Sequence, residues 1–156
     1  MIFRRHAVMF LATGGYVGRI PVAPGTFGSL IGIPIVYVLD KFTWQTALIA
    51  MVLVVLGAVW VAHNAERMLQ AKDPGCIVID EIAGMCVALL GLPFTLSTVA
   101  AGFFIFRIFD VIKPPPIRQL ERHLAGGWGV VMDDVAAGAA THLVLWAGLR
   151  FVGVLV

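Results

Sequence analysis

Charged residues divide the chain into long uncharged stretches, and the lengths of these stretches predict helices. Uncharged residues fill positions 20–39, 42–65 and 82–106, and a fourth stretch covers 135–149. A helix needs about 20 predominantly apolar residues to cross a bilayer. The second stretch contains no proline over residues 44–62 and therefore predicts one continuous membrane span.

The other stretches are interrupted by proline and glycine, which predicts shorter helices. The first helix is expected over residues 26–39, after a Pro/Gly-rich approach. Gly91-Leu92-Pro93 splits the third stretch into helices near 80–91 and 95–110, and the last helix is expected from residue 135 onward.

Apolar and polar residues do not alternate over any useful length, so no strand is predicted. We therefore expect an all-α fold, a compact multi-helix bundle embedded in a membrane, forming a single domain over residues 1–156. Composition agrees, because 60% of residues are hydrophobic, only 13% are charged and the mean hydropathy is +0.97. Soluble domains carry about 25% charged residues. The natural solvent of this chain is lipid.

Charge and cysteine content exclude two classes of protein. The net charge is +2 and basic residues form no dense run, which argues against a nucleic-acid partner. Cys76 and Cys86 lie too far apart for a CxxC pair, so a zinc or redox motif is not predicted.

Acidic residues in apolar surroundings are the main functional signal. In a membrane protein such a residue is costly and must face protein, metal or water. Asp40, Asp73 and Glu121 stand among turn residues and other charges, which favours a solvated position. The six remaining acidic residues lie at predicted helix ends or within apolar stretches: Glu66, Asp80, Glu81, Asp110, Asp133 and Asp134.

Two adjacent acidic pairs predict a metal site. Asp80-Glu81 follows an apolar run and opens a helix, and the helix dipole would account for only one of these carboxylates. Asp133-Asp134 precedes another small-residue helix, where one aspartate would serve as N-cap and the other as ligand. If the two helix starts converge, their carboxylates, with Glu66 as a further ligand, suit Mg²⁺.

Candidates for phosphate recognition accompany these acids. Thr26 and Ser29 stand at a glycine-rich helix start, where backbone N–H groups favour anions, although a simple helix cap fits equally well. Arg107 and Asp110 share one helix face and could also be only an ion pair. Lys113 precedes three prolines that fix the direction of the chain.

Covalent phosphatase routes lack their residues in this sequence. Neither cysteine has an arginine six positions later, no DxD pair occurs, and no histidine lies in an SRx₅H segment. If the protein is a phosphatase, the remaining mechanism is attack by a water molecule that a metal ion activates.

Four segments resemble the bacterial phosphatidylglycerophosphatase A family and cover about a third of the chain. They are PGTFGSL (24–30), DPGCIVIDEIAG (73–84), FRIFDVIKPPPIRQLER (106–122) and GGWGVVMDDVAAG (126–138). Family members often have tryptophan before the DE pair, where this chain has Ile79.

The resemblance implies a Mg²⁺-dependent enzyme that hydrolyses phosphatidylglycerophosphate to phosphatidylglycerol and phosphate. It also implies a multi-pass protein of the bacterial inner (cytoplasmic) membrane, acting on the cytoplasmic leaflet. Oligomeric state is left open. The predicted catalytic residues are Asp80, Glu81, Asp134 and Lys113. The predicted substrate contacts are Thr26, Ser29, Arg107, Asp110 and Lys113, and the predicted metal ligands are Glu66, Asp80, Glu81, Asp133 and Asp134.

Two alternatives do not involve catalysis. Buried acids also mark small membrane ion or proton carriers and their subunits, and acid–base pairs can join the helices of a structural subunit. A carrier has no need of the glycine-rich GTFGS and KPPP segments, and a structural subunit would not need six acids in apolar surroundings without as many nearby cations. Release of phosphate from the lipid would separate the enzyme from both.

Overall fold

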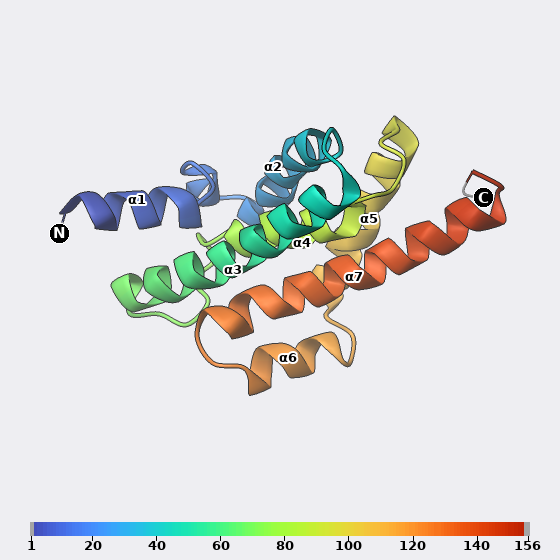
Figure 1. The fold of residues 1–156 in the computed structure, drawn as a ribbon. Helices are drawn as coiled ribbons and strands as arrows, with labels where there is room; N and C mark the ends of the chain where they lie inside the picture. The colour runs from blue at the N-terminus through green and yellow to red at the C-terminus, as the bar shows by residue number, and fades with distance from the viewer. Residues whose placement is uncertain (1, 155–156) are drawn as a thin grey trace.

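The computed structural model describes residues 2–154, and every regular element within this range is helical (Figure 1). The predicted all-α class is thus confirmed. The elements are α1 (Ile2–Ala12), the 3₁₀ helix η1 (Val17–Arg19), α2 (Pro24–Leu39), α3 (Trp44–Leu69), α4 (Ile79–Leu89), α5 (Leu96–Ile112), α6 (Ile117–His123) and α7 (Gly127–Phe151).

Helix α4 is the centre of the bundle. It packs against α2, α3, α5 and α7, while α1 packs on α3 and α6 packs on α7 (Figure 1). The two long helices α3 and α7 run antiparallel, since Gly127 at the start of α7 lies against His63 near the end of α3. The short central helix is therefore covered by longer ones.

Small residues allow α4 and α7 to approach closely. A Cβ atom on Gly138 would overlap the backbone carbonyl of Gly84, and a Cβ on Gly84 would lie 2.7 Å from the carbonyl oxygen of Asp134. Without side chains at the crossing, the two backbones are in direct contact. This crossing places Asp134 beside the first turn of α4.

Most predicted helix boundaries agree with the structure, and one does not. The break near Pro93 is present, because α4 ends at Leu89 and the Thr95 hydroxyl accepts a hydrogen bond from Thr98 N–H at the start of α5. The last helix begins at Gly127, not near residue 135. The predicted start was wrong because Gly127 packs, as part of the helix, against the backbone of α3.

Within the described residues, two helices, α3 and α7, are long and apolar enough to cross a membrane by length and composition. Large hydrophobic side chains are exposed on both, including Leu53 and Trp60 on α3 and Leu143 on α7. Apolar surface of this extent marks contact with lipid or protein. These helices suggest a membrane protein.

Candidate active site

Three carboxylates from two helices meet inside the bundle. Ligand oxygens of Asp80, Glu81 and Asp134 all lie within 4.8 Å of one another. Asp80 and Glu81 stand in the first turn of α4, and Asp134 lies about two turns into α7. Asp80 and Asp134 are buried, and Glu81 is half-buried. The predicted convergence of the two acidic segments is present, although only one of them is at a helix start.

Burial and mutual repulsion disfavour the ionised form of this cluster. Burial raises the pKa of Asp80 well above its ordinary value, and the neighbouring charges of Glu81 and Asp134 raise it further. Burial also raises the pKa of Glu81, with a smaller increase from the charge of Asp110. A hydrogen bond with Asp80 and the charge of Arg107 act in the opposite direction. The cluster requires protons or a cation to be stable.

One oxygen of each carboxylate lacks a partner. Asp80 Oδ1, Glu81 Oε2 and Asp134 Oδ2 are buried and have no hydrogen-bond partner among the described residues. Buried polar atoms are nearly always paired, and unpaired anionic oxygens are especially costly. Carboxylates that meet in this way are hard oxygen ligands of the kind that bind a divalent cation. The residues fit a metal ion.

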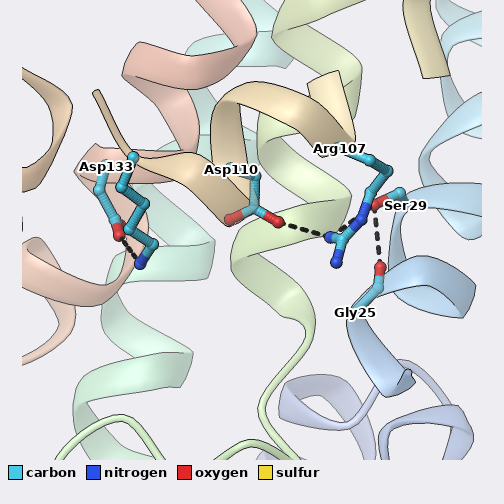
Figure 2. A network of polar contacts seen from close by, with 6 residues as sticks. Gly25, Ser29, Arg107, Asp110 and Asp133 are labelled. Carbon is cyan, nitrogen blue, oxygen red and sulfur yellow. Dashed lines mark hydrogen bonds and ion pairs between the residues drawn. The ribbon is translucent and has the colours of Figure 1, made fainter. Parts of the chain in front are cut away.

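The guanidinium group of Arg107 lies next to the cluster, near Glu81. Figure 2 shows it held between Asp110 on one side and Ser29 on the other. Arg107 Nη1 lies 2.5 Å from Asp110 Oδ2 and donates to Ser29 Oγ at 3.4 Å. The Ser29 hydroxyl in turn donates to the carbonyl of Gly25 at 2.9 Å. These contacts connect α5 to the first turn of α2, so the cation is positioned before any ligand binds.

Gly25 is a site residue that the sequence analysis named only as part of a motif. A Cβ atom there would overlap Oε1 of Glu81 and would lie 3.1 Å from Nη1 of Arg107. Only glycine leaves room for the carboxylate and the guanidinium against the start of α2. The backbone of this first helical turn therefore borders the cluster.

The second acidic pair is divided between two roles. Asp134 joins the carboxylate cluster, whereas Asp133 Oδ2 forms an ion pair with Lys113 Nζ at 2.5 Å (Figure 2). Lys113 ends α5 with a positive φ of 46°. One aspartate of this pair was expected to be the N-cap of the helix, but Gly126 occupies that position, so this expectation was wrong.

The remaining predicted residues lie outside the three-carboxylate group. Glu66 Oε1 accepts a hydrogen bond from the backbone N–H of Asp73 at 2.9 Å and thereby holds the connection after α3. Thr26 is half-buried in the first turn of α2. Asp73 is exposed, as expected, yet its charge contributes to the raised pKa of Asp80. Its position beside the site was not foreseen.

Fold and site together define a class of protein. It is a helical bundle with a buried carboxylate cluster that could hold a metal, and two cations, Arg107 and Lys113, are held nearby in ion pairs with Asp110 and Asp133. Cations next to metal ligands are what a phosphate ester requires, because its charge must be neutralised as well.

Comparison with known proteins identifies the family. The sequence profile of phosphatidylglycerophosphatase A matches residues 10–149. The chain is 39% identical to phosphatidylglycerophosphatase A of Escherichia coli over 137 residues, which are 87% of this chain and 80% of that protein. It is 34% identical to phosphatidylglycerophosphatase A of Haemophilus influenzae, with 91% and 88% of the two chains covered. The chain belongs to the phosphatidylglycerophosphatase A family.

A third relative has a different name. The chain is 37% identical to a putative phosphatidylinositol-3-phosphatase of Bacteroides thetaiotaomicron, covering 88% of this chain and 90% of that protein. No solved structure matches. The predicted family and the predicted enzyme class, a phosphoric monoester hydrolase, are confirmed.

Proposed function

We propose that the protein is a Mg²⁺-dependent lipid phosphatase that hydrolyses phosphatidylglycerophosphate to phosphatidylglycerol and phosphate. The observation that carries this proposal is the set of three unpaired buried carboxylate oxygens next to Arg107. The substrate is taken from two relatives named phosphatidylglycerophosphatase A.

Asp80, Glu81 and Asp134 would hold the Mg²⁺ ion through the oxygens that lack other partners. When bound, the ion polarises the phosphoryl oxygen and lowers the pKa of a water nucleophile. Since the pKa of Asp80 is raised, this carboxyl group retains a proton more readily when no cation is present. Asp80 would have to give up that proton in order to hold a cation as a carboxylate ligand.

The two cations would bind the phosphate group. Arg107 presents a planar guanidinium that suits phosphate oxygens, and its contacts with Asp110 and Ser29 fix its orientation. Lys113 supplies a second positive charge, held against α7 by Asp133. Preorganised charges of this kind stabilise the transition state because they need not rearrange as negative charge develops.

A second substrate fits the same chemistry. The putative phosphatidylinositol-3-phosphatase relative suggests a phosphorylated inositol lipid as the alternative substrate. Both lipids carry a phosphomonoester on a headgroup, so the carboxylates and cations would act alike on either. The rest of the headgroup would decide specificity.

We place the site on the cytoplasmic side of the bacterial inner membrane, in a multi-pass protein. Arg67 and Lys72 lie at the end of α3, and Lys113 and Arg118 lie at the α5–α6 connection, all at the end of the bundle where α4 begins. The opposite end has fewer basic residues, with Lys41 between α2 and α3 and Arg150 near the end of α7. Basic loops remain in the cytoplasm.

The test is release of inorganic phosphate by the purified protein from phosphatidylglycerophosphate in mixed micelles, with Mg²⁺ and then with EDTA. Phosphatidylinositol-3-phosphate serves as the second substrate. We expect Mg²⁺-dependent release that Asp80→Asn reduces by at least about a hundredfold, since it removes one metal ligand. Asp40→Asn, an exposed carboxylate at the end of α2, is the control and should retain activity.

Release from the inositol lipid alone would replace the proposed substrate. No release from either lipid would overturn the enzyme assignment and favour the ion or proton carrier. Full activity of Asp80→Asn would remove this residue from the site.

A further inference from the structure

A basic hollow lies outside the carboxylate site, at the edge of the bundle where α1 turns into η1. It has a volume of about 310 Å³ and is lined by Arg5, His6, Met9, Tyr16 and Arg19. None of these lining residues is acidic. The hollow therefore has a positive charge for which its own walls supply no counter-charge.

Local sequence builds this corner. The Thr13 hydroxyl accepts a hydrogen bond from Tyr16 N–H at 3.0 Å, and Tyr16 adopts a positive φ of 72°. The chain thereby reverses and brings η1 back toward α1. The Arg19 guanidinium then lies over the Tyr16 ring, 4.7 Å from its centroid, while the ring contacts Phe10 edge to face. Contact with the Tyr16 ring thus positions Arg19, which belongs to η1, whereas Arg5 belongs to α1.

The corner is attached to the segment that leads into the active site. Val78 N–H, at the start of α4, donates to the carbonyl of Ala12 at 2.8 Å. Gly18 packs so closely on Cys76 that a Cβ atom would overlap the Cys76 carbonyl. The elements that form the hollow therefore contact the segment just before Asp80, at the end of the bundle where α4 begins.

The surface of α1 identifies the chemistry of a ligand. This helix has 11 residues, too few to cross a bilayer, which requires about 20. It exposes Phe3, Phe10 and Leu11 together with Arg4 and Arg5. A short helix with exposed aromatic, aliphatic and basic residues is typical of a membrane surface that carries anionic lipids. A nucleic-acid site would not expose so much apolar surface beside its basic residues.

We propose that the α1–η1 corner binds the headgroup of an anionic glycerophospholipid, with Arg5 and Arg19 contacting its phosphodiester. Tyr16 lies beside the headgroup, where aromatic side chains are enriched at the bilayer interface. The site is separate from the carboxylate cluster and does not depend on phosphatase activity. It anchors the start of α4 next to anionic lipid.

The experiment measures binding of phosphatidylserine and of phosphatidylcholine to the detergent-purified protein by native mass spectrometry, in EDTA. Phosphatidylserine is used because it carries the phosphodiester and a net negative charge but is not the product of the proposed reaction. The test variant is Arg5→Gln/Arg19→Gln. The matched control is Lys41→Gln/Arg150→Gln, which removes two cations that also lie over aromatic rings, at Tyr37 and Trp146.

We expect the test variant to bind phosphatidylserine roughly 25-fold more weakly, since each basic residue near an anionic lipid contributes about 1 kcal/mol. The control variant should bind both lipids as the wild type does, and the test variant should lose less affinity for phosphatidylcholine, whose choline cation offsets the charge of the phosphodiester. Arg5→Lys/Arg19→Lys should retain most of the affinity, because the charge is kept. A circular-dichroism melt establishes that each variant is folded.

Equal loss of affinity in the control variant would overturn the proposal, as would equal binding of the two lipids by the wild type. Inorganic phosphate is added as a competitor in a separate arm. Displacement of phosphatidylserine by phosphate at millimolar concentration would replace the lipid site with a site for free anions.

Discussion

Ser29 and Thr141 form the same local hydrogen bond in two different helices. Both are fully buried, and each hydroxyl donates to the carbonyl four residues earlier, at 2.9 Å to Gly25 and 2.8 Å to Ala137. Ser29 also accepts a hydrogen bond from Arg107. Its hydroxyl therefore belongs both to the helix and to the site, and under the proposed function it would act on a substrate through Arg107.

This difference predicts the effect of removing each hydroxyl. Ser29→Ala and Thr141→Val should each lower the free energy of unfolding by about 1 kcal/mol. Only Ser29→Ala should lower kcat/KM for the lipid substrate, by roughly fivefold, because Arg107 loses one of two contacts that orient it. Phosphate-release kinetics and denaturant melts measure the two quantities. An equal loss of activity in both variants would contradict a positioning role for Ser29.

The two cysteines should differ in reactivity. Cys86 is fully buried, its thiol donates to the carbonyl of Gly32, and burial raises its pKa to about 12 from an ordinary value of 9.0. Cys76 is half-buried. At pH 8 we expect a maleimide to modify one thiol per folded chain and two after denaturation, counted by mass spectrometry.

The raised pKa of Cys86 also fixes the sign of a pH effect. The folded state binds the thiol proton more tightly than the unfolded state, so this group lowers stability only as the pH rises above 9.0. Cys86→Ala should remove that alkaline component of the stability profile. If Cys86→Ala loses as much stability above pH 9.0 as the wild type does, the effect does not come from Cys86.

At the scale of elements, helix crossings determine the geometry of the site. Gly84 and Gly138 bring α4 and α7 into backbone contact, and this contact sets the position of Asp134 relative to Asp80. A side chain at the crossing must separate the helices, because its neighbour is backbone and cannot change rotamer.

Gly138→Ala should therefore lower the free energy of unfolding by about 1–3 kcal/mol and remove most phosphatase activity. Gly148→Ala is a matched control in the same helix, where a Cβ atom would contact nothing within 4 Å. It should retain activity and gain up to about 1 kcal/mol in stability from improved helix propensity. Thermal melts and phosphate release distinguish the two variants. Similar stability and activity of the two variants would contradict the role of the α4–α7 crossing in positioning the site.

Some elements were predictable from the sequence because their signals are local. The proline break before α5 and the acidic start of α4 lie in short segments, and both were predicted. The start of α7 was not, because Gly127 reads as a loop residue until its packing on α3 is known. The separation of Asp133 from Asp134 could not be predicted either, since it depends on where α5 places Lys113.

At the scale of the whole molecule, the proposed orientation of the protein in the membrane assigns each end of the bundle to one side of the bilayer. Lys72 lies in the α3–α4 connection at the site end, and Lys41 lies between α2 and α3 at the other end. Because basic connections are retained in the cytoplasm, the α3–α4 connection with Lys72 should face the cytoplasm, and the α2–α3 connection with Lys41 should face the outer side of the membrane.

Cysteine labelling tests this orientation in a background of Cys76→Ser and Cys86→Ala. With a maleimide that does not cross membranes, Lys41→Cys should be labelled in intact cells, and Lys72→Cys only in inverted vesicles. Retained phosphatase activity serves as the control for correct folding. The reverse pattern would place the site on the outer side of the membrane.

The carboxylate cluster joins the first turn of α4 to α7, the last helix of the described chain. During translation, Asp80 and Glu81 are synthesised before Asp134, and domains form as their parts emerge from the ribosome. Under the proposed function, the set of metal ligands is therefore complete only after Asp134 has been synthesised and α7 has packed on α4. A chain that ends before Asp134 lacks one carboxylate of the cluster and should not hydrolyse the lipid.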